Sequence, residues 1–272
     1  MTKRKTNHIK LGEEFWASLP GTPGIYRVFD ADDVLVYVGK AKNLRRRLGQ
    51  YRNARRLKAH RKMRAVMKAA VRIETETCET HRAALLLELR SIQVHQPRLN
   101  VAGVFHFMYP MIGIKTGTRS LDLILTGKPE VFSGFEWHGT YRLRRPTRRA
   151  FFALTRLLAF LGPSKKMRLE RNLFSFGASF AELEADWASP AREFFMGESP
   201  FLLEMLILAL ADRGSARAKR EDIQEDLGLL KKFWKQEALA LRRLRQQANF
   251  SVYPVPQLER DALRILALTE IP

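Results

Sequence analysis

The sequence contains a single cysteine, Cys78, among 272 residues. One thiol cannot form an internal disulfide, which excludes a small secreted scaffold held together by disulfides. It also excludes a zinc or iron–sulfur site made of four thiolates from this chain. With 46% hydrophobic residues, the chain is able to bury a core of its own, and its length fits one large domain or two modest ones.

Long apolar runs are also missing. The most apolar stretch, Phe201–Ala211, has 11 residues and includes Glu204, whereas a transmembrane helix needs about 20 apolar residues. The basic residues 1–10 lead into Leu11-Gly12-Glu13-Glu14 and not into the apolar core of an export signal. We therefore expect a soluble protein of the cytoplasm.

Acidic residues are scarce, since 28 Asp and Glu stand against 48 Lys and Arg and leave a net charge of +20. Residues 41–70 contain 12 basic residues and no acidic residue, and further basic clusters lie at 142–149 and 165–171. For any single run, a solvated helix face is the alternative explanation. Surfaces that serve only solubility mix both signs, however, so three such runs favour nucleic acid as the partner.

Turn residues and hydrophobic periodicity predict a small α/β unit in the first hundred residues. After the turn sequence at 20–24, β-prone runs at 25–29 and 34–38 predict a hairpin, and a third strand is expected over 71–77. Asn43 is placed to cap a helix that carries Leu44, Leu48 and Tyr51. A second basic helix is expected over 57–70, and a helix capped by Thr80 is expected to run to about residue 95, before Pro97.

Beyond residue 100 the pattern predicts a different region. Strands are expected at 105–116 and 121–126 and a helix at 147–161, followed by an irregular stretch at 165–197. Helices are expected at 200–212 and 219–247. The predicted fold class is therefore α/β: a small three-stranded sheet with flanking helices, followed by an α+β region and then a mainly helical region.

Several polar side chains of the first unit are unusually placed. They are Tyr26 and Tyr37 on the predicted hairpin, Lys40 after it, Arg47 in the next helix, and Glu88 inside the apolar stretch 83–89. Each alone has an ordinary explanation. Strand tyrosines usually pack with a solvated hydroxyl. Arg47 could be an ordinary surface arginine, and Glu88 could be a carboxylate at the edge of a helix.

Together these residues belong to a pattern that resembles a known family. Gly24-Ile25-Tyr26, ten intervening residues and Tyr37-Val38-Gly39 resemble the GIY-YIG nuclease motif, with Val38 in the place of the usual isoleucine. The continuation is more specific. Residues 39–48, 83–88 and 96–101 resemble the UvrC branch of that family, and the resemblance covers about residues 20–101.

The resemblance continues more loosely downstream. Residues 109–115 and 138–141 are similar to the region after the nuclease domain in UvrC and in its shorter paralogue Cho, and residues 194–199 resemble the segment that introduces the family's helical UVR region. The cysteine cluster that the family usually carries after the helix at 147–161 is missing, so no iron–sulfur cluster is expected. The RNase H-like second half is missing too, so only the incision 3′ to a lesion is expected.

The resemblance implies a role for each site residue. Tyr37 is implied as the general base, with its pKa lowered by Lys40 and a metal, while Tyr26 positions the water and the phosphate. Arg47 is implied to stabilise the charge on the phosphorane, and Glu88 to hold a single Mg²⁺ or Mn²⁺ ion. Asn100 resembles a residue that braces the site. Which tyrosine acts as the base is left open.

The basic clusters complete the expected DNA-binding surface. Its predicted members are Lys42, Arg45, Arg46, Arg52, Arg55, Arg56, Arg144, Arg145, Arg148 and Arg149. The expected domains are a basic segment at 1–19, a nuclease domain at 20–101, an α+β extension at 102–164, and a mainly helical region at 165–272 that is available for partner binding.

The function implied is a divalent-metal-dependent DNA endonuclease of nucleotide excision repair, which acts on double-stranded or damaged DNA with partners of the UvrA and UvrB type. Two alternatives stay open. One is a standalone GIY-YIG nuclease for branched or foreign DNA. The other is a non-catalytic DNA-binding protein on a nuclease scaffold, against which the presence of all the motif side chains argues.

Overall fold

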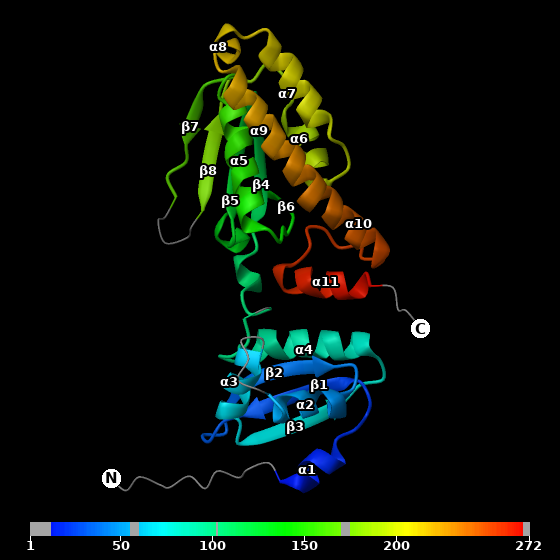
Figure 1. The fold of residues 1–272 in the computed structure, drawn as a ribbon. Coiled ribbons are helices and arrows are strands. Elements are labelled where there is room, and N and C mark those ends of the chain that lie inside the picture. The colour runs from blue at the N-terminus through cyan, green and yellow to red at the C-terminus, as the bar shows by residue number, and fades with distance from the viewer. Residues whose placement is uncertain (1–11, 55–59, 102, 170–174, 269–272) are drawn as a thin grey trace, which may run out of the picture. The chain divides into compact units, whose positions relative to one another are not determined.

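The computed structural model describes residues 12–54, 60–101, 103–169 and 175–268 (Figure 1). The chain forms two units. The first comprises residues up to Phe105 and from Leu268 onward, and the second comprises His106–Ala267. Each unit has its own hydrophobic core.

The first unit is built on a three-stranded antiparallel sheet. The strands are β1 (Gly24–Phe29), β2 (Leu35–Ala41) and β3 (Arg72–Thr77), in the order β2-β1-β3. The strand β2 therefore lies at an edge. In the β1–β2 register Tyr26 is opposite Gly39 and Val28 is opposite Tyr37. Because side chains alternate between faces along a strand, Tyr26 and Tyr37 lie on the same face.

The helices of this unit are α1 (Glu13–Ser18), α2 (Leu44–Arg52), α3 (Arg61–Ala69) and α4 (His81–His95). Both predicted caps are confirmed: the Asn43 side chain accepts a hydrogen bond from the Arg46 backbone N–H, and Thr80 accepts one from Ala83. Helix α2 packs on the face that carries the two tyrosines, and α4 covers the other face through Ala84 and Ile92.

The second unit contains a five-stranded antiparallel sheet. Its strands are β4 (Met111–Gly117), β5 (Ser120–Thr126), β6 (Glu136–His138), β7 (Ser164–Lys166) and β8 (Phe176–Phe180), in the order β6-β4-β5-β8-β7. Short 3₁₀ turns, η2 (His106–Met108) and η3 (Pro129–Val131), flank the β4–β5 hairpin.

Helices pack on this sheet and on one another, and the long helix α5 packs against α9. They are α5 (Arg144–Leu158), α6 (Ala188–Met196), α7 (Phe201–Ala211), α8 (Gly214–Arg217), α9 (Arg220–Phe233), the π turn η5 (Trp234–Ala238), α10 (Leu239–Gln247), a 3₁₀ turn η6 (Gln257–Glu259) and α11 (Arg260–Leu266). The core between them is rich in aromatic residues, including Tyr141, Phe194, Phe195 and Phe233.

The fold class predicted from the sequence is confirmed, and some element boundaries differ. The strand expected from residue 105 begins at Met111, after Pro110, which has no N–H to donate to a sheet. Helix α5 begins three residues before the predicted Thr147, because Pro146 is tolerated in a first helical turn. Strands β7 and β8 continue the sheet where an irregular stretch was expected, and the predicted helix 219–247 is interrupted by the π turn. Among the described helices, none is long and apolar enough to cross a bilayer.

Candidate active site

Three tyrosines meet on the face of the first sheet that α2 covers. Tyr26 and Tyr37 are only 1% and 6% exposed, and their ring centroids are 6.0 Å apart. Tyr51, on α2, packs edge-on against Tyr26 and accepts a hydrogen bond from its hydroxyl, with 3.0 Å between the two oxygens. The strand register and one helix therefore bring three phenol hydroxyls into one cluster.

Gly39 makes room for this cluster. A Cβ atom at this position would lie 2.4 Å from Cζ and Oη of Tyr26 and 2.9 Å from the Tyr37 ring. Both rings are buried, so neither can move out into solvent without losing its packing. Position 39 must therefore be glycine, because any larger residue there would collide with the ring of Tyr26.

We expect Gly39→Ala to displace Tyr26, to lower the free energy of unfolding by about 1–3 kcal/mol, and to reduce whatever reaction the site performs. Thermal unfolding and an activity assay check both effects. Gly49→Ala is the matched control, because a Cβ there meets nothing within 4 Å and α2 should gain helix propensity. Equal unfolding temperatures for the Gly39→Ala protein and the wild type would contradict this packing account.

Arg47 lies against the tyrosine cluster. Its guanidinium carbon is 5.2 Å from the centroid of the Tyr51 ring, one helical turn further along α2. Burial acts to lower the pKa of Arg47, but the nearby phenols, Tyr26 foremost, outweigh it and leave the pKa raised. The side chain is therefore a fixed positive charge beside the tyrosine hydroxyls.

Backbone groups on the free edge of β2 find partners outside the sheet. The Asn100 side chain accepts a hydrogen bond from the Val38 N–H and donates one to the Val38 carbonyl, both at 2.9 Å. The Leu99 N–H donates to the Val36 carbonyl at 3.0 Å. Asn100 thus holds the edge of β2 as a neighbouring strand would.

Glu88 reaches the same edge from α4. The Lys40 backbone N–H interacts with its carboxylate, which agrees with the alternation along β2, because Val38 and Lys40 point their N–H groups the same way. Burial raises the pKa of Glu88, while Lys40, Lys62 and Arg47 act to lower it. A half-buried carboxylate surrounded by cations thus lies within electrostatic reach of Tyr37.

The hydroxyls of Tyr26 and Tyr37 are neutral at physiological pH, because burial raises the pKa of both. Burial raises the pKa of Tyr37 well above its usual range, and Tyr51 and Glu88 raise it further. The pKa of Tyr26 is raised as well, again mainly by burial. The Lys40 charge acts on Glu88 and on His81, and it acts to lower the pKa of each.

Two further residues of the site were not recognised in the sequence. Tyr51 was predicted only as part of the apolar face of its helix, although its position four residues after Arg47 places both side chains on one side of α2. Lys62, on α3, lies with its ammonium 5.0 Å from the centroid of the Tyr37 ring. No sequence signal distinguished Lys62 from the other basic residues of this stretch.

With this geometry established, comparisons with known proteins identify the domain. A family model described as the UvrC-like GIY-YIG domain matches residues 22–101. Residues 22–101 form a UvrC-like GIY-YIG domain. The domain resembles the UvrABC system protein C of Pectobacterium atrosepticum, at 41% identity over 98 residues, and that of Actinobacillus succinogenes, also at 41% over 98 residues.

The similarity is confined to part of each protein. Each match covers 36% of this chain and 16% of the relative, so the matched chain spans about a sixth of the length of these relatives. Among solved structures, the GIY-YIG N-terminal endonuclease domain of UvrC from Thermotoga maritima, bound to its catalytic divalent cation, magnesium, is 29% identical. The match covers 37% of this chain and 100% of the Thermotoga maritima chain, with a TM-score of 0.30.

The predicted DNA-binding residues near the GIY-YIG domain's site divide into two groups. Lys42, just before α2, and Arg46, on α2, are exposed. Arg45 and Arg52 have partners in the unit, because Arg45 donates to the Leu19 carbonyl and Arg52 pairs with Glu13 and lies over the Trp16 ring. Arg55 and Arg56 lie outside the described residues.

The other predicted DNA-binding residues lie in the second unit. Arg144, Arg145, Arg148 and Arg149 all lie in the first two turns of α5 and are exposed. Arg148 lies over the Phe176 ring, and Arg149 pairs with Glu225 at 3.4 Å. An exposed ion pair such as Arg149–Glu225 contributes little to stability. Because both side chains are exposed, the guanidinium groups of Arg148 and Arg149 are accessible to a phosphate.

Proposed function

We propose that the protein is a divalent-metal-dependent DNA endonuclease that hydrolyses phosphodiester bonds at the edge of β2. The observation that carries this proposal is the convergence of Tyr26, Tyr37, Arg47 and Glu88 in a UvrC-like GIY-YIG domain. Hydrolysis of a phosphodiester needs a held water, a positive charge beside the phosphate, and stabilisation of the leaving oxygen. The site offers residues for each requirement.

We assign the attacking water to Tyr37, which would act as the phenolate after its own proton has passed to solvent and would then accept the proton of the water. We assign the positioning of water and phosphate to Tyr26. Arg47 lies beside both phenols and would bind the non-bridging phosphate oxygens, where negative charge grows in the transition state. Tyr51 orients Tyr26 through their hydrogen bond. Lys40 acts to lower the pKa of Glu88, against the larger raising effect of burial.

The donor set fits a single hard cation. Magnesium is commonly bound by one or two carboxylates together with water and substrate phosphate, and Glu88 offers one half-buried carboxylate at the site. Groups of three or more His, Cys, Asp or Glu side chains that could hold a metal do not occur among the described residues. We infer that Glu88 holds one Mg²⁺ or Mn²⁺ ion, which would supply Lewis-acid stabilisation of the leaving oxygen.

We further propose that the first turns of α5 contribute to the DNA footprint. Neutralising Arg144, Arg145, Arg148 and Arg149 together is expected to weaken binding to all duplex sequences alike, because phosphate contacts carry no sequence information. The slope of log K against log salt should fall by about 2–4, at about 0.9 for each lost contact. Fluorescence anisotropy titrations at several salt concentrations measure it, and an unchanged slope would remove α5 from the footprint.

The biological setting that we propose is nucleotide excision repair, with the cut made 3′ to a lesion in concert with a UvrB-like protein. The similarity to UvrABC system proteins C supports this setting. The second unit, His106–Ala267, lies beyond the matched region, which favours a standalone nuclease for branched DNA as the second candidate.

The test compares three labelled substrates with Mg²⁺: a duplex with one bulky adduct, the same duplex without it, and a three-way junction. Excision repair predicts cutting 3′ to the adduct that is stimulated by added UvrB, and little cutting of the other two. Preferred cutting of the junction without UvrB supports the second candidate. Binding without cleavage of any substrate would contradict both and indicate a non-catalytic DNA-binding protein.

A further inference from the structure

Helices α9 and α10, joined by the π turn at Trp234–Ala238, form one continuous rod in the second unit (Figure 1). The exposed side chains change character along this rod. In its first part, residues 220–229, they are of mixed sign: Arg220, Glu221, Asp222, Gln224 and Glu225. A mixed-sign surface is what solubility alone requires.

From Lys231 onward the exposed side chains are all basic or amide. They are Lys231, Lys232, Lys235, Gln236, Arg243, Gln246 and Gln247. Residues 231–247 are all described, and their one carboxylate, Glu237, is 2% exposed and turned inward. No exposed acid therefore offsets the positive charge on this half of the rod. We call Lys231, Lys232, Lys235 and Arg243 the α9–α10 stripe.

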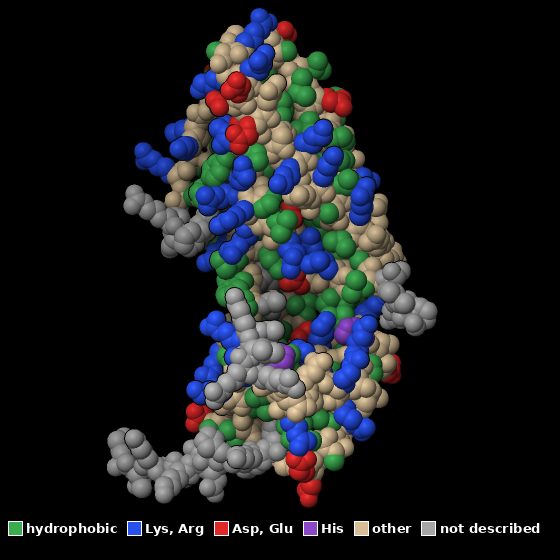
Figure 2. Space-filling view, viewed as in Figure 1, with side chains coloured by type: hydrophobic (Ala, Val, Ile, Leu, Met, Phe, Trp, Pro, Cys, Tyr) green, Lys and Arg blue, Asp and Glu red, His purple; other side chains and the backbone are tan. Residues whose placement is uncertain are grey.

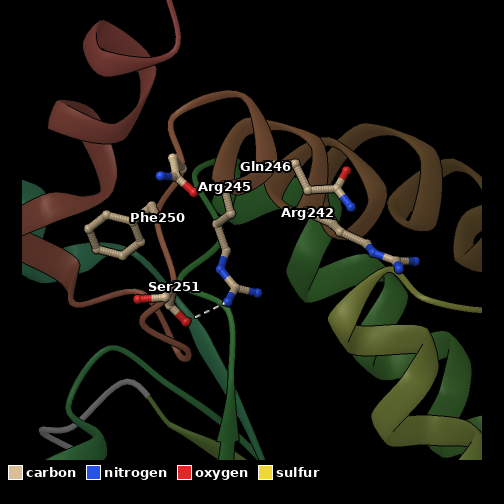
Figure 3. A pocket seen from close by; sticks show the side chains of 6 residues that line it. Arg242, Arg245, Gln246, Phe250 and Ser251 are labelled. Carbon is tan, nitrogen blue, oxygen red and sulfur yellow. Dashed lines mark hydrogen bonds between the residues drawn. The ribbon is translucent and has the colours of Figure 1, made fainter.

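The two half-buried arginines of α10 have a structural role and are not part of the stripe. Figure 3 shows them at an open pocket of about 270 Å³ near the end of α10, with their guanidinium groups directed apart. Arg245 donates to the Ser251 carbonyl at 2.9 Å and lies over the Tyr253 ring, and Arg242 faces the carbonyls of Gly197 and Glu198 at 3.3 Å. Since the two groups do not converge, the pocket is not an anion site.

Glu237 connects the stripe to α5. Its carboxylate accepts a hydrogen bond from the Arg142 N–H at 2.6 Å and also interacts with the Leu143 N–H, at the beginning of α5. Leu143 is the N-cap residue of α5, so Glu237 contacts the last two residues before the helix. Glu237, in the π turn, therefore binds the backbone that leads into α5 and ties the arginine-bearing end of α5 to the rod. Figure 2 shows Lys and Arg side chains over α5 and over α9 and α10 on one face.

We propose that the α9–α10 stripe binds the phosphate backbone of duplex DNA, as a second part of the footprint that begins on α5. Residues 231–247 span about 24 Å of helix, which is long enough to follow several phosphates. Lysines with interspersed glutamines supply cations and hydrogen-bond donors for phosphate oxygens. A membrane-binding helix would also expose apolar residues, and the exposed positions of this stretch have none. The proposal rests on the DNA-directed function proposed above.

The test uses the full chain and a fluorescein-labelled, unmodified 24-base-pair duplex in EDTA, so that binding is read without cleavage. The stripe variant combines Lys232→Gln, Lys235→Gln and Arg243→Gln. The matched control combines Arg217→Gln, Lys219→Gln and Arg220→Gln, which removes the same charge from exposed positions of the same unit. The stripe variant should lower the slope of log K against log salt by about 1–3, whereas the control should change it by less than 1.

Equal slopes for the stripe variant and the wild type, or equal losses in the stripe variant and the control, would overturn the proposal. So would loss of binding to phosphatidylserine vesicles with the DNA slope intact, which would indicate a membrane surface. Circular dichroism confirms that each variant is folded. Plasmid nicking with Mg²⁺ is measured separately, so a protein that binds through the stripe but never nicks refutes the endonuclease proposal and leaves the stripe in place.

Discussion

Glu88→Gln is expected to reduce Mg²⁺-dependent DNA cleavage by about 10³-fold, because the single carboxylate that would hold the metal is lost and metal stabilisation is worth several kcal/mol. Glutamine keeps the size of the side chain and can still accept from the Lys40 N–H, so the edge of β2 should stay in place. Single-turnover cleavage of a labelled duplex measures the loss. Affinity for the same duplex in EDTA should change less than threefold.

The control for this prediction is Glu79→Gln, which removes an exposed carboxylate just before α4. It should cleave at the wild-type rate. Comparable cleavage by the Glu88→Gln and wild-type proteins would remove Glu88 from the site. A parallel loss in the control would show that net charge, and not the metal ligand, governs the rate.

The environment of Glu88 also predicts how cleavage and stability depend on pH. Burial raises its pKa above the usual 4.5, so cleavage should be lost on the acid side at a higher pH than for an exposed glutamate. The same shift means that the fold favours the protonated form, and the ionised carboxylate lowers stability above the pKa of the unfolded chain. Glu88→Gln should therefore unfold at a higher temperature than the wild type at neutral pH. This difference should shrink as the pH falls through the window in which Glu88 protonates.

Arg47→Ala carries the second large expected effect, a loss of about 10²–10³-fold in the rate of the chemical step. The guanidinium lies beside the Tyr26 and Tyr51 rings, where it would meet the charge that develops on the phosphate. Arg47→Lys should recover only part of the rate, since an ammonium lacks the planar fork that binds two phosphate oxygens. Single-turnover kinetics separate this loss from a change in binding.

Arg90→Ala is the matched control, because Arg90 is an exposed cation on α4. It should leave the chemical step unchanged. A wild-type single-turnover rate in the Arg47→Ala protein would contradict the assigned role. A loss that disappears at saturating protein concentration would show that Arg47 serves binding alone.

Local sequence signals predicted the first unit well. Asn43 and Thr80 begin their helices as the capping rule requires, and the alternating runs gave the strands of the small sheet. Tyr26 and Tyr37 could be placed together because a hairpin register fixes which side chains share a face. Each of these signals depends on a few neighbouring residues, so it can be recognised in the sequence without knowledge of the tertiary structure.

Contacts between distant segments could not be predicted in this way. The clamp of Asn100 on Val38 joins residues 62 positions apart, and the role of Gly39 depends on a ring from another strand. Strand β7, with the exposed pair Lys165 and Lys166, has no hydrophobic alternation because it lies at a sheet edge. Glu237 is turned inward because it accepts from the Arg142 N–H just before α5, a contact between residues 95 positions apart that no local pattern predicts.

The most direct test of the central claim, a metal-dependent phosphodiesterase site centred on Glu88, is relaxation of supercoiled plasmid by the wild-type, Glu88→Gln and Glu79→Gln proteins across a Mn²⁺ titration. The wild-type and Glu79→Gln proteins should nick with a rate that rises and saturates with Mn²⁺ and that vanishes in EDTA. The Glu88→Gln protein should stay near background throughout. Nicking by the wild-type protein that persists in EDTA, or a Glu88→Gln protein that follows the wild-type curve, would contradict the claim.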